Sequence, residues 1–137
     1  MTPTTDPLLR ELGEAAEGLV YSSETDRPFE PFFLAGGGAR WPVGAPEFAA
    51  LLGKPPGARV EERSLDRFLA RHLETSDPYD TRAQQVRPRY EALKALLLAR
   101  LREVRVFRLG EIEVRCYVVG GDGRGNLAGL STVAVET

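Results

Sequence analysis

The C-terminal third of the chain alternates between apolar and charged residues with a period of two. From Val104 onward, four apolar side chains fall on one side of this pattern: Ile112, Val114, Cys116 and Val118. Three charged side chains fall on the other side: Glu111, Glu113 and Arg115. This spacing is that of a half-buried β-strand. A glycine cluster at 120–125 and a second β-branched run to Thr137 follow, so we expect a hairpin whose last strand fixes the end of the chain.

The N-terminal segment and the middle of the chain carry helix signals. Asp6 is suited to cap a helix and Pro7 to begin it, and apolar residues then recur at helical spacing until Gly18. The longest helix is expected from its apolar stripe: Val86, Tyr90, Leu93, Leu97, Leu101 and Val104. Pro88 leaves two alternatives, a helix that starts at this proline or one that starts near Asp80 and bends.

Shorter elements are expected between these helices. Residues 19–22 and 29–35 have strand composition, and the polar residues 23–27 connect them. Residues 46–52 predict a short helix, Val60 a brief strand, and Ser64 the cap of another short helix.

This order of elements predicts an α/β (α+β) fold. We expect a three-layer α/β/α sandwich in which helices cover both faces of a mixed, largely antiparallel sheet. A length of 137 residues suits one domain spanning 1–137, and 42% hydrophobic with 28% charged residues is typical of a globular protein. No apolar run reaches membrane-spanning length and no secretory signal is visible, so we expect the protein to be cytoplasmic.

Several kinds of chemistry are disfavoured by what the sequence lacks. His72 is the single histidine and Cys116 the single cysteine, which together cannot form a zinc cluster or a conventional histidine-paired nucleophile. We therefore expect no enzyme activity, no cofactor and no metal site. Arginines are frequent around the long helix, but the net charge is −2 and no nucleic-acid-binding motif is present, which argues against direct nucleic-acid binding.

Two separated segments resemble one known family. The first is GLVYSSETDRPFE at residues 18–30, and the second combines FRLGEIEV at 107–114, YVVG at 117–120, GNLAGLST at 125–132 and VET at 135–137. Together they look like the signatures of the nuclease A inhibitor family, and they lie near opposite ends of the chain. The resemblance implies a pathogenesis-related-protein-like α/β/α sandwich.

The same resemblance implies a function and a site. Family members are inhibitors of sugar-nonspecific, Mg²⁺-dependent nucleases, in which the glutamate of the Ser-Glu loop and the terminal threonine block the active site. These residues correspond to Glu24 and Thr137 here. Such a protein would be a monomer when free, and its partner would be the nuclease, with its active-site Mg²⁺ and basic residues.

Further residues are expected in the same contact surface as Glu24 and Thr137. Glu136 precedes the terminal carboxylate, and we expect Ser76, Asp77 and Tyr79 to widen the contact from a loop. The alternative is a non-catalytic protein-interaction domain of the same fold with a different partner. A small enzyme is less favoured because no acid, base and nucleophile set is present.

Overall fold

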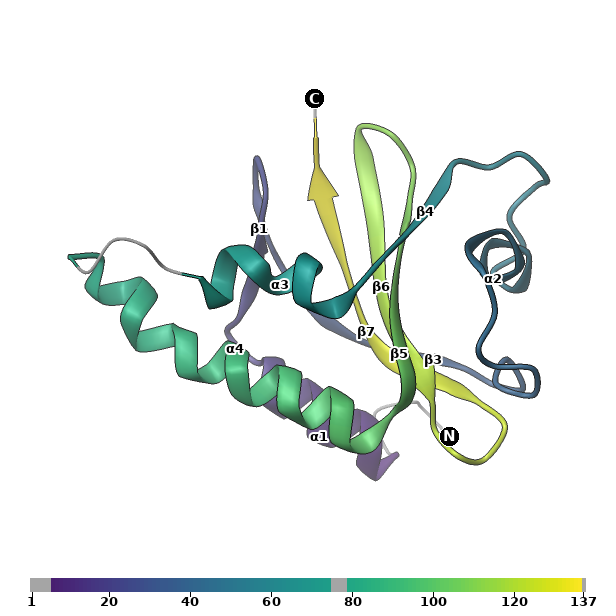
Figure 1. The fold of residues 1–137 in the computed structure, drawn as a ribbon, viewed down its shortest axis with the longest axis horizontal. Coiled ribbons are helices and arrows are strands. Elements are labelled where there is room, and N and C mark those ends of the chain that lie inside the picture. The colour runs from purple at the N-terminus through teal and green to yellow at the C-terminus, as the bar shows by residue number, and fades with distance from the viewer. Residues whose placement is uncertain (1–5, 75–78, 137) are drawn as a thin grey trace.

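The computed structural model describes residues 6–74 and 79–136 (Figure 1). A five-stranded sheet in the order β3-β7-β6-β5-β4 forms its centre, and β1 and β2 form a separate two-stranded hairpin. The strands are β1 (Val20–Ser22), β2 (Asp26–Pro28), β3 (Glu30–Leu34), β4 (Val60–Arg63), β5 (Arg102–Leu109), β6 (Glu113–Gly121) and β7 (Leu127–Val135). Every pairing in the described part of the chain is antiparallel, so the expected mixture with parallel strands is not seen there.

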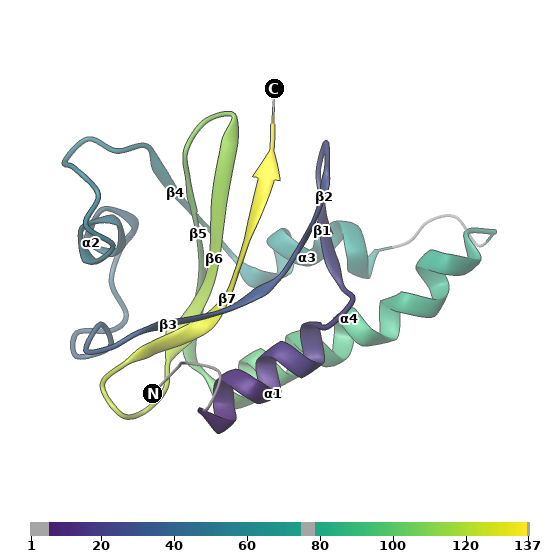
Figure 2. The same ribbon diagram turned by 180° about the vertical axis from the view of Figure 1, so that it is seen from behind.

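The two longest strands, β6 and β7, form the middle of the sheet. They pair over their whole length, from Glu113 opposite Val135 to Gly121 opposite Leu127. On its other side β7 pairs with β3, but only from Leu127 to Ser131. The last residues of β7 therefore extend beyond β3, toward the edge of the molecule where the β1–β2 hairpin lies (Figure 2).

Helices lie against both faces of the sheet. They are α1 (Pro7–Ala16), α2 (Ala45–Leu51), α3 (Leu65–Leu73) and α4 (Thr81–Arg100). α1, α3 and α4 share one apolar core with inward residues such as Val106 and Val118, whereas α2 packs on the neighbouring residues Phe107 and Val119. Successive strand residues thus enter opposite cores, as the period of two requires. None of the helices described here is long and apolar enough to cross a membrane.

The helix starts agree with the sequence analysis. Asp6 accepts a hydrogen bond from the Leu8 amide at 2.8 Å, and Ser64 accepts one from the Arg67 amide at 3.2 Å. Asp80 caps α4 by accepting from the Ala83 amide at 2.9 Å. The alternative in which α4 starts near Asp80 is therefore correct, and Pro88 lies inside the helix.

The end of α4 differs from the expectation. The predicted helical stripe included Leu101 and Val104, but α4 ends at Arg100 and the chain turns into β5 at once. Glu103 has a positive φ of 52°, and the β5–β6 register shifts between Arg102 and Arg105. The indole Nε1 of Trp41 donates to the carbonyls of Arg102 and Glu103, which fixes this irregular start.

Two further expectations are wrong. Part of the predicted connection 23–27 forms β2, because Asp26–Pro28 pairs with Val20–Ser22. Ile112, expected on the apolar face of a strand, instead lies in the β5–β6 turn and is 63% exposed. Gly110, with φ of 115°, breaks the alternating run into two strands at this point. Cys116 is fully buried in β6, as expected.

Candidate functional site

The tip of the β1–β2 hairpin is attached to the end of β7. The amide of Val135 donates to the hydroxyl Oγ of Ser23 at 2.9 Å, and the amide of Glu24 donates to the Val135 carbonyl at 3.3 Å. The hydroxyl of Thr132 donates to the Pro28 carbonyl at 2.9 Å, lower on the same pair of elements. Residues 23–25 at the hairpin tip are thereby placed beside residues 135 and 136.

The last turn of α3 supports the hairpin from below. His72 Nε2 accepts from the Ser22 amide at 3.3 Å, and Arg71 Nη1 donates to the Ser22 carbonyl at 2.7 Å. The ring of Tyr21 stacks on Phe68, with centroids 4.3 Å apart and planes 3° from parallel. Burial, and then the charge of Arg71, lower the pKa of His72, so the imidazole is neutral and can accept this hydrogen bond at neutral pH.

The β5–β6 turn approaches the end of β7 from the other side. The amide of Glu136 donates to the Ile112 carbonyl at 2.9 Å, which extends the β6–β7 ladder by one residue past Val135. Three segments therefore meet at one end of the molecule: the hairpin tip, the end of β7 and the β5–β6 turn (Figure 1). We call residues 23–25, 110–112 and 135–136 the rim.

A buried arginine lies directly beneath the rim. Arg108 in β5 is 4% exposed, and its Nη1 donates to Glu61 Oε1 at 2.5 Å. Its Nη2 forms an ion pair with Glu136 Oε1, although this atom has no partner with hydrogen-bond geometry among the described residues. Arg63 also pairs with Glu61, at 3.0 Å. Although partial burial acts to raise it, the hydrogen bond from Arg108 and the positive charge of Arg63 hold the pKa of Glu61 below its usual range.

An open groove of about 450 Å³ runs along the rim on the α3 side. Glu24 and Glu136 line it together with Arg63 and Arg71. Two carboxylates and two guanidinium groups therefore line the same groove. Both carboxylates can offer anionic oxygen atoms to a partner, and the carboxylate of Glu136 is positioned by its ion pair with Arg108.

The structure brings together two of the six expected site residues. Glu24 and Glu136 share the groove, whereas Thr137, Ser76 and Asp77 lie outside the described residues. Tyr79 is 89% exposed in the segment just before α4. The N-terminal end of α4 projects to the side, away from the sheet, whereas β7 ends at the top of both views (Figures 1 and 2).

Two residues of this site, Ser23 and Arg108, were not predicted from the sequence. Ser23 became visible only through its contact with Val135, which is 112 positions away. Arg108 did leave a signal, because it occupies the same face of β5 as Val106, where the alternation calls for an apolar residue. A charged residue at an inward position of a strand is informative because burying it requires a partner.

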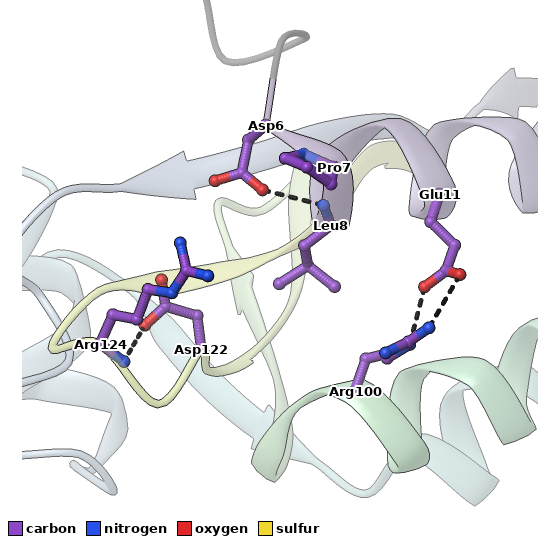
Figure 3. Close-up of a pocket in the computed structure, with 7 residues that line it drawn as sticks. All are labelled: Asp6, Pro7, Leu8, Glu11, Arg100, Asp122 and Arg124. Carbon is purple, nitrogen blue, oxygen red and sulfur yellow. Dashed lines mark hydrogen bonds and ion pairs between the residues drawn. The ribbon is translucent and has the colours of Figure 1, made fainter.

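Two other features of the molecule offer less to a partner or ligand. No group of three or more histidine, cysteine, aspartate or glutamate residues suited to a metal ion occurs within 6–74 and 79–136. A cavity of about 300 Å³ lies between the start of α1, the end of α4 and the β6–β7 loop (Figure 3). Its acidic groups have internal partners: Glu11 pairs with Arg100, and Asp122 accepts from the Arg124 amide at 2.7 Å.

Comparisons with known proteins identify the family of the chain. A search of individually curated proteins gave no match. A comparison with protein families matched residues 6–137 to the family described as "NuiA: Nuclease A inhibitor-like protein". The matched region contains every segment of the rim and the α3 support beneath it. The chain therefore belongs to the nuclease A inhibitor-like family.

Proposed function

We propose that this protein is an inhibitor of a sugar-nonspecific, Mg²⁺-dependent endonuclease that cleaves DNA and RNA. The observation that carries the proposal is the attachment of Glu24 to the end of β7 in a member of an inhibitor-like family. In this proposal the inhibitor binds stoichiometrically and has no catalytic activity. The rim enters the cleft in which the nuclease binds the scissile phosphate.

The chemistry of the target explains why carboxylates suit this role. A nuclease of this class holds the phosphate with a hard divalent cation and basic side chains, and such cations prefer oxygen ligands. The carboxylate of Thr137 would take the place of a phosphate oxygen while offering no bond to cleave. Glu24 would contact the water shell of the ion or a basic side chain nearby.

Preorganisation supports the same proposal. Val135 is paired with β6 on one side and with the hairpin tip on the other, so the backbone leading to residue 137 is restrained in the free protein. A restrained group loses less conformational entropy on binding than a flexible one does. Eight of the twenty acidic residues but only three basic residues fall within residues 1–50, which would help steer the protein toward a basic cleft.

The proposal also covers the loop before α4 and the organisation of the whole chain. Ser76, Asp77 and Tyr79 would extend the contact only if the nuclease also reaches the start of α4. We further propose that residues 1–137 act as one cytoplasmic unit, monomeric when free, with the pathogenesis-related-protein-like three-layer architecture. The helices on both faces of the sheet support that architecture.

The test is a titration of a purified Mg²⁺-dependent, sugar-nonspecific nuclease with the intact protein and two altered forms. One form carries Glu24→Ala, and the other carries three glycines after Thr137, which moves the terminal carboxylate while keeping every residue. Glu14→Ala is the matched control, since Glu14 is an exposed glutamate on α1, away from the rim. We expect one-to-one inhibition by the intact protein and the control.

Each altered form should need at least about tenfold more protein for half-inhibition, as expected when an anionic contact to a cation is lost. Equal potency of the extended form would refute the role of the terminal carboxylate. Absence of inhibition by the intact protein would refute the function itself and favour an interaction domain with another protein partner.

A further inference from the structure

We propose that Arg108 is a positioning residue, which holds the end of β7 in the orientation needed to bind the nuclease; this inference rests on the proposed function. Arg108 is 4% exposed, so a partner protein cannot reach it without displacing part of the rim. Any effect of Arg108 on binding must therefore act through the residues it contacts.

Arg108 lies among apolar residues, where its positive charge needs carboxylate partners. Its side chain points into the same face of the sheet as Val106, and its register partner in β6 is the buried Cys116. Val114, also buried, lies two residues before Cys116 on that face. A guanidinium in such surroundings is strongly unfavourable unless carboxylates compensate its charge.

The two carboxylates that compensate it come from distant strands. Glu61 belongs to β4 at one edge of the sheet, and Glu136 directly follows β7. In the strand order β7-β6-β5-β4, two strands separate these elements, so no backbone hydrogen bond can join them. The planar fork of Arg108 joins them by presenting one Nη atom to each carboxylate.

The ion pair between Arg108 and Glu136 lies where the backbone hydrogen bonds between β6 and β7 end. The regular β6–β7 pairing ends with Val135 opposite Glu113, and beyond it the amide of Glu136 makes one further hydrogen bond, to Ile112. The ion pair with Arg108 fixes the side chain of the same residue. Glu136 is thus held at both its backbone and its carboxylate, one position before the carboxylate assigned to inhibition.

The direct test is amide hydrogen exchange in the free protein, measured by NMR for the intact chain and for Arg108→Met. We expect the Glu136 amide to exchange at least about tenfold faster in the variant, because local opening no longer has to break the ion pair. The Val118 amide, in the middle of β6, reports whether the whole fold is destabilised. Arg105→Met is the matched control: it removes an arginine from the same strand that pairs with Glu62 on the opposite face.

A second variant keeps the test decisive if Arg108→Met does not fold. Glu136→Gln leaves Arg108 paired with Glu61 but weakens its contact with the chain end, and it should also accelerate exchange at residue 136. Arg108→Lys keeps the charge without the fork, so its exchange rate should fall between those of the intact protein and Arg108→Met. Unchanged exchange at Glu136 in both Arg108→Met and Glu136→Gln would overturn the inference.

Inhibition assays separate this inference from the proposed function. If the intact protein inhibits, Arg108→Met should weaken inhibition at least about tenfold while Arg105→Met should not, at a temperature at which both are folded. Unchanged inhibition by Arg108→Met would overturn the positioning role even if exchange increases. If the intact protein does not inhibit, the proposed function fails and this role in inhibition fails with it, whereas the exchange result still decides whether Arg108 fixes the chain end.

Discussion

Replacing Ser23 with alanine tests whether the tie between the hairpin tip and β7 matters. The Ser23 hydroxyl is the side-chain acceptor for the Val135 amide, at 2.9 Å, and the donor is only partly buried. A typical hydrogen bond contributes about 1 kcal/mol net, and water can partly replace the lost acceptor here. We therefore expect Ser23→Ala to lower the free energy of unfolding by about 1 kcal/mol.

The same figure sets the expected effect on inhibition. If the tie holds Glu24 and residue 135 in the bound arrangement, its loss adds an ordering cost of about 1 kcal/mol to binding, which corresponds to about a fivefold weaker complex. The melting temperature should fall by about 4 °C for a domain of this size. Thermal unfolding and the nuclease titration measure the two quantities independently.

Ser22→Ala is the matched control for this substitution. The adjacent Ser22 contacts His72 and Arg71 through its backbone amide and carbonyl, which alanine retains. We expect the control to match the intact protein in both assays. If Ser23→Ala binds the nuclease as tightly as Ser22→Ala does, the hairpin tip is not preorganised by this hydrogen bond and the reasoning is refuted.

Three further predictions concern other parts of the molecule. Ile112→Ser should weaken inhibition about tenfold, because Ile112 is an exposed aliphatic residue on the rim that a partner would bury. Leu98→Ser on α4, which is similarly exposed, should not change inhibition, and equal effects of the two variants would contradict this prediction. Phe48→Ala should lower the free energy of unfolding by about 3–5 kcal/mol in urea titrations, because this fully buried ring stacks on Phe107 at 4.5 Å; a loss below about 1 kcal/mol would mean that α2 contributes little to the core. Because the pKa of His72 in the folded protein lies below its ordinary value of 6.5, the unfolded chain binds the proton more readily, so stability should fall as pH decreases below 6.5. This loss of stability between about pH 7.5 and about pH 5.5, measured by urea unfolding, should be smaller in His72→Gln. If both proteins lose the same free energy of unfolding, His72 is not the group responsible.

Local signals in the sequence predicted much of the fold. Caps such as Asp6 and Ser64 mark helix starts through contacts within three residues, so they can be identified without tertiary information. The β6–β7 loop was likewise predictable as a hairpin from its glycines, and Asp122 orders it by accepting from the Arg124 and Asn126 amides.

The errors arose where distant contacts decide the local structure. Leu101 and Val104 suit a helical stripe and a strand equally well, and the observed strand start is supported by distant partners: β6, and the indole of Trp41 about sixty residues earlier in the chain. Ile112 fits the alternating pattern in sequence, but the conformation of Gly110 places it in a turn. Local periodicity cannot distinguish one long strand from two strands with matching phase.

The candidate site was predictable only where a family signature exists. Glu24 and Glu136 were identified by resemblance and by position in the chain, and the structure places them in one groove. Ser23 and Arg108 act through partners brought close by the fold, so their roles depend on the strand order rather than on neighbouring residues.

The short β1–β2 hairpin also protects the sheet against unwanted association. β3 covers β7 only as far as Ser131, so residues 132–135 would otherwise present an open strand edge, the kind of surface at which chains pair and aggregate. The hairpin occupies that edge through contacts of Thr132 and Val135. The β1–β2 hairpin, proposed to recognise the nuclease, therefore also covers an exposed strand edge. Substitutions that loosen it should make the protein more prone to self-association as well as less inhibitory.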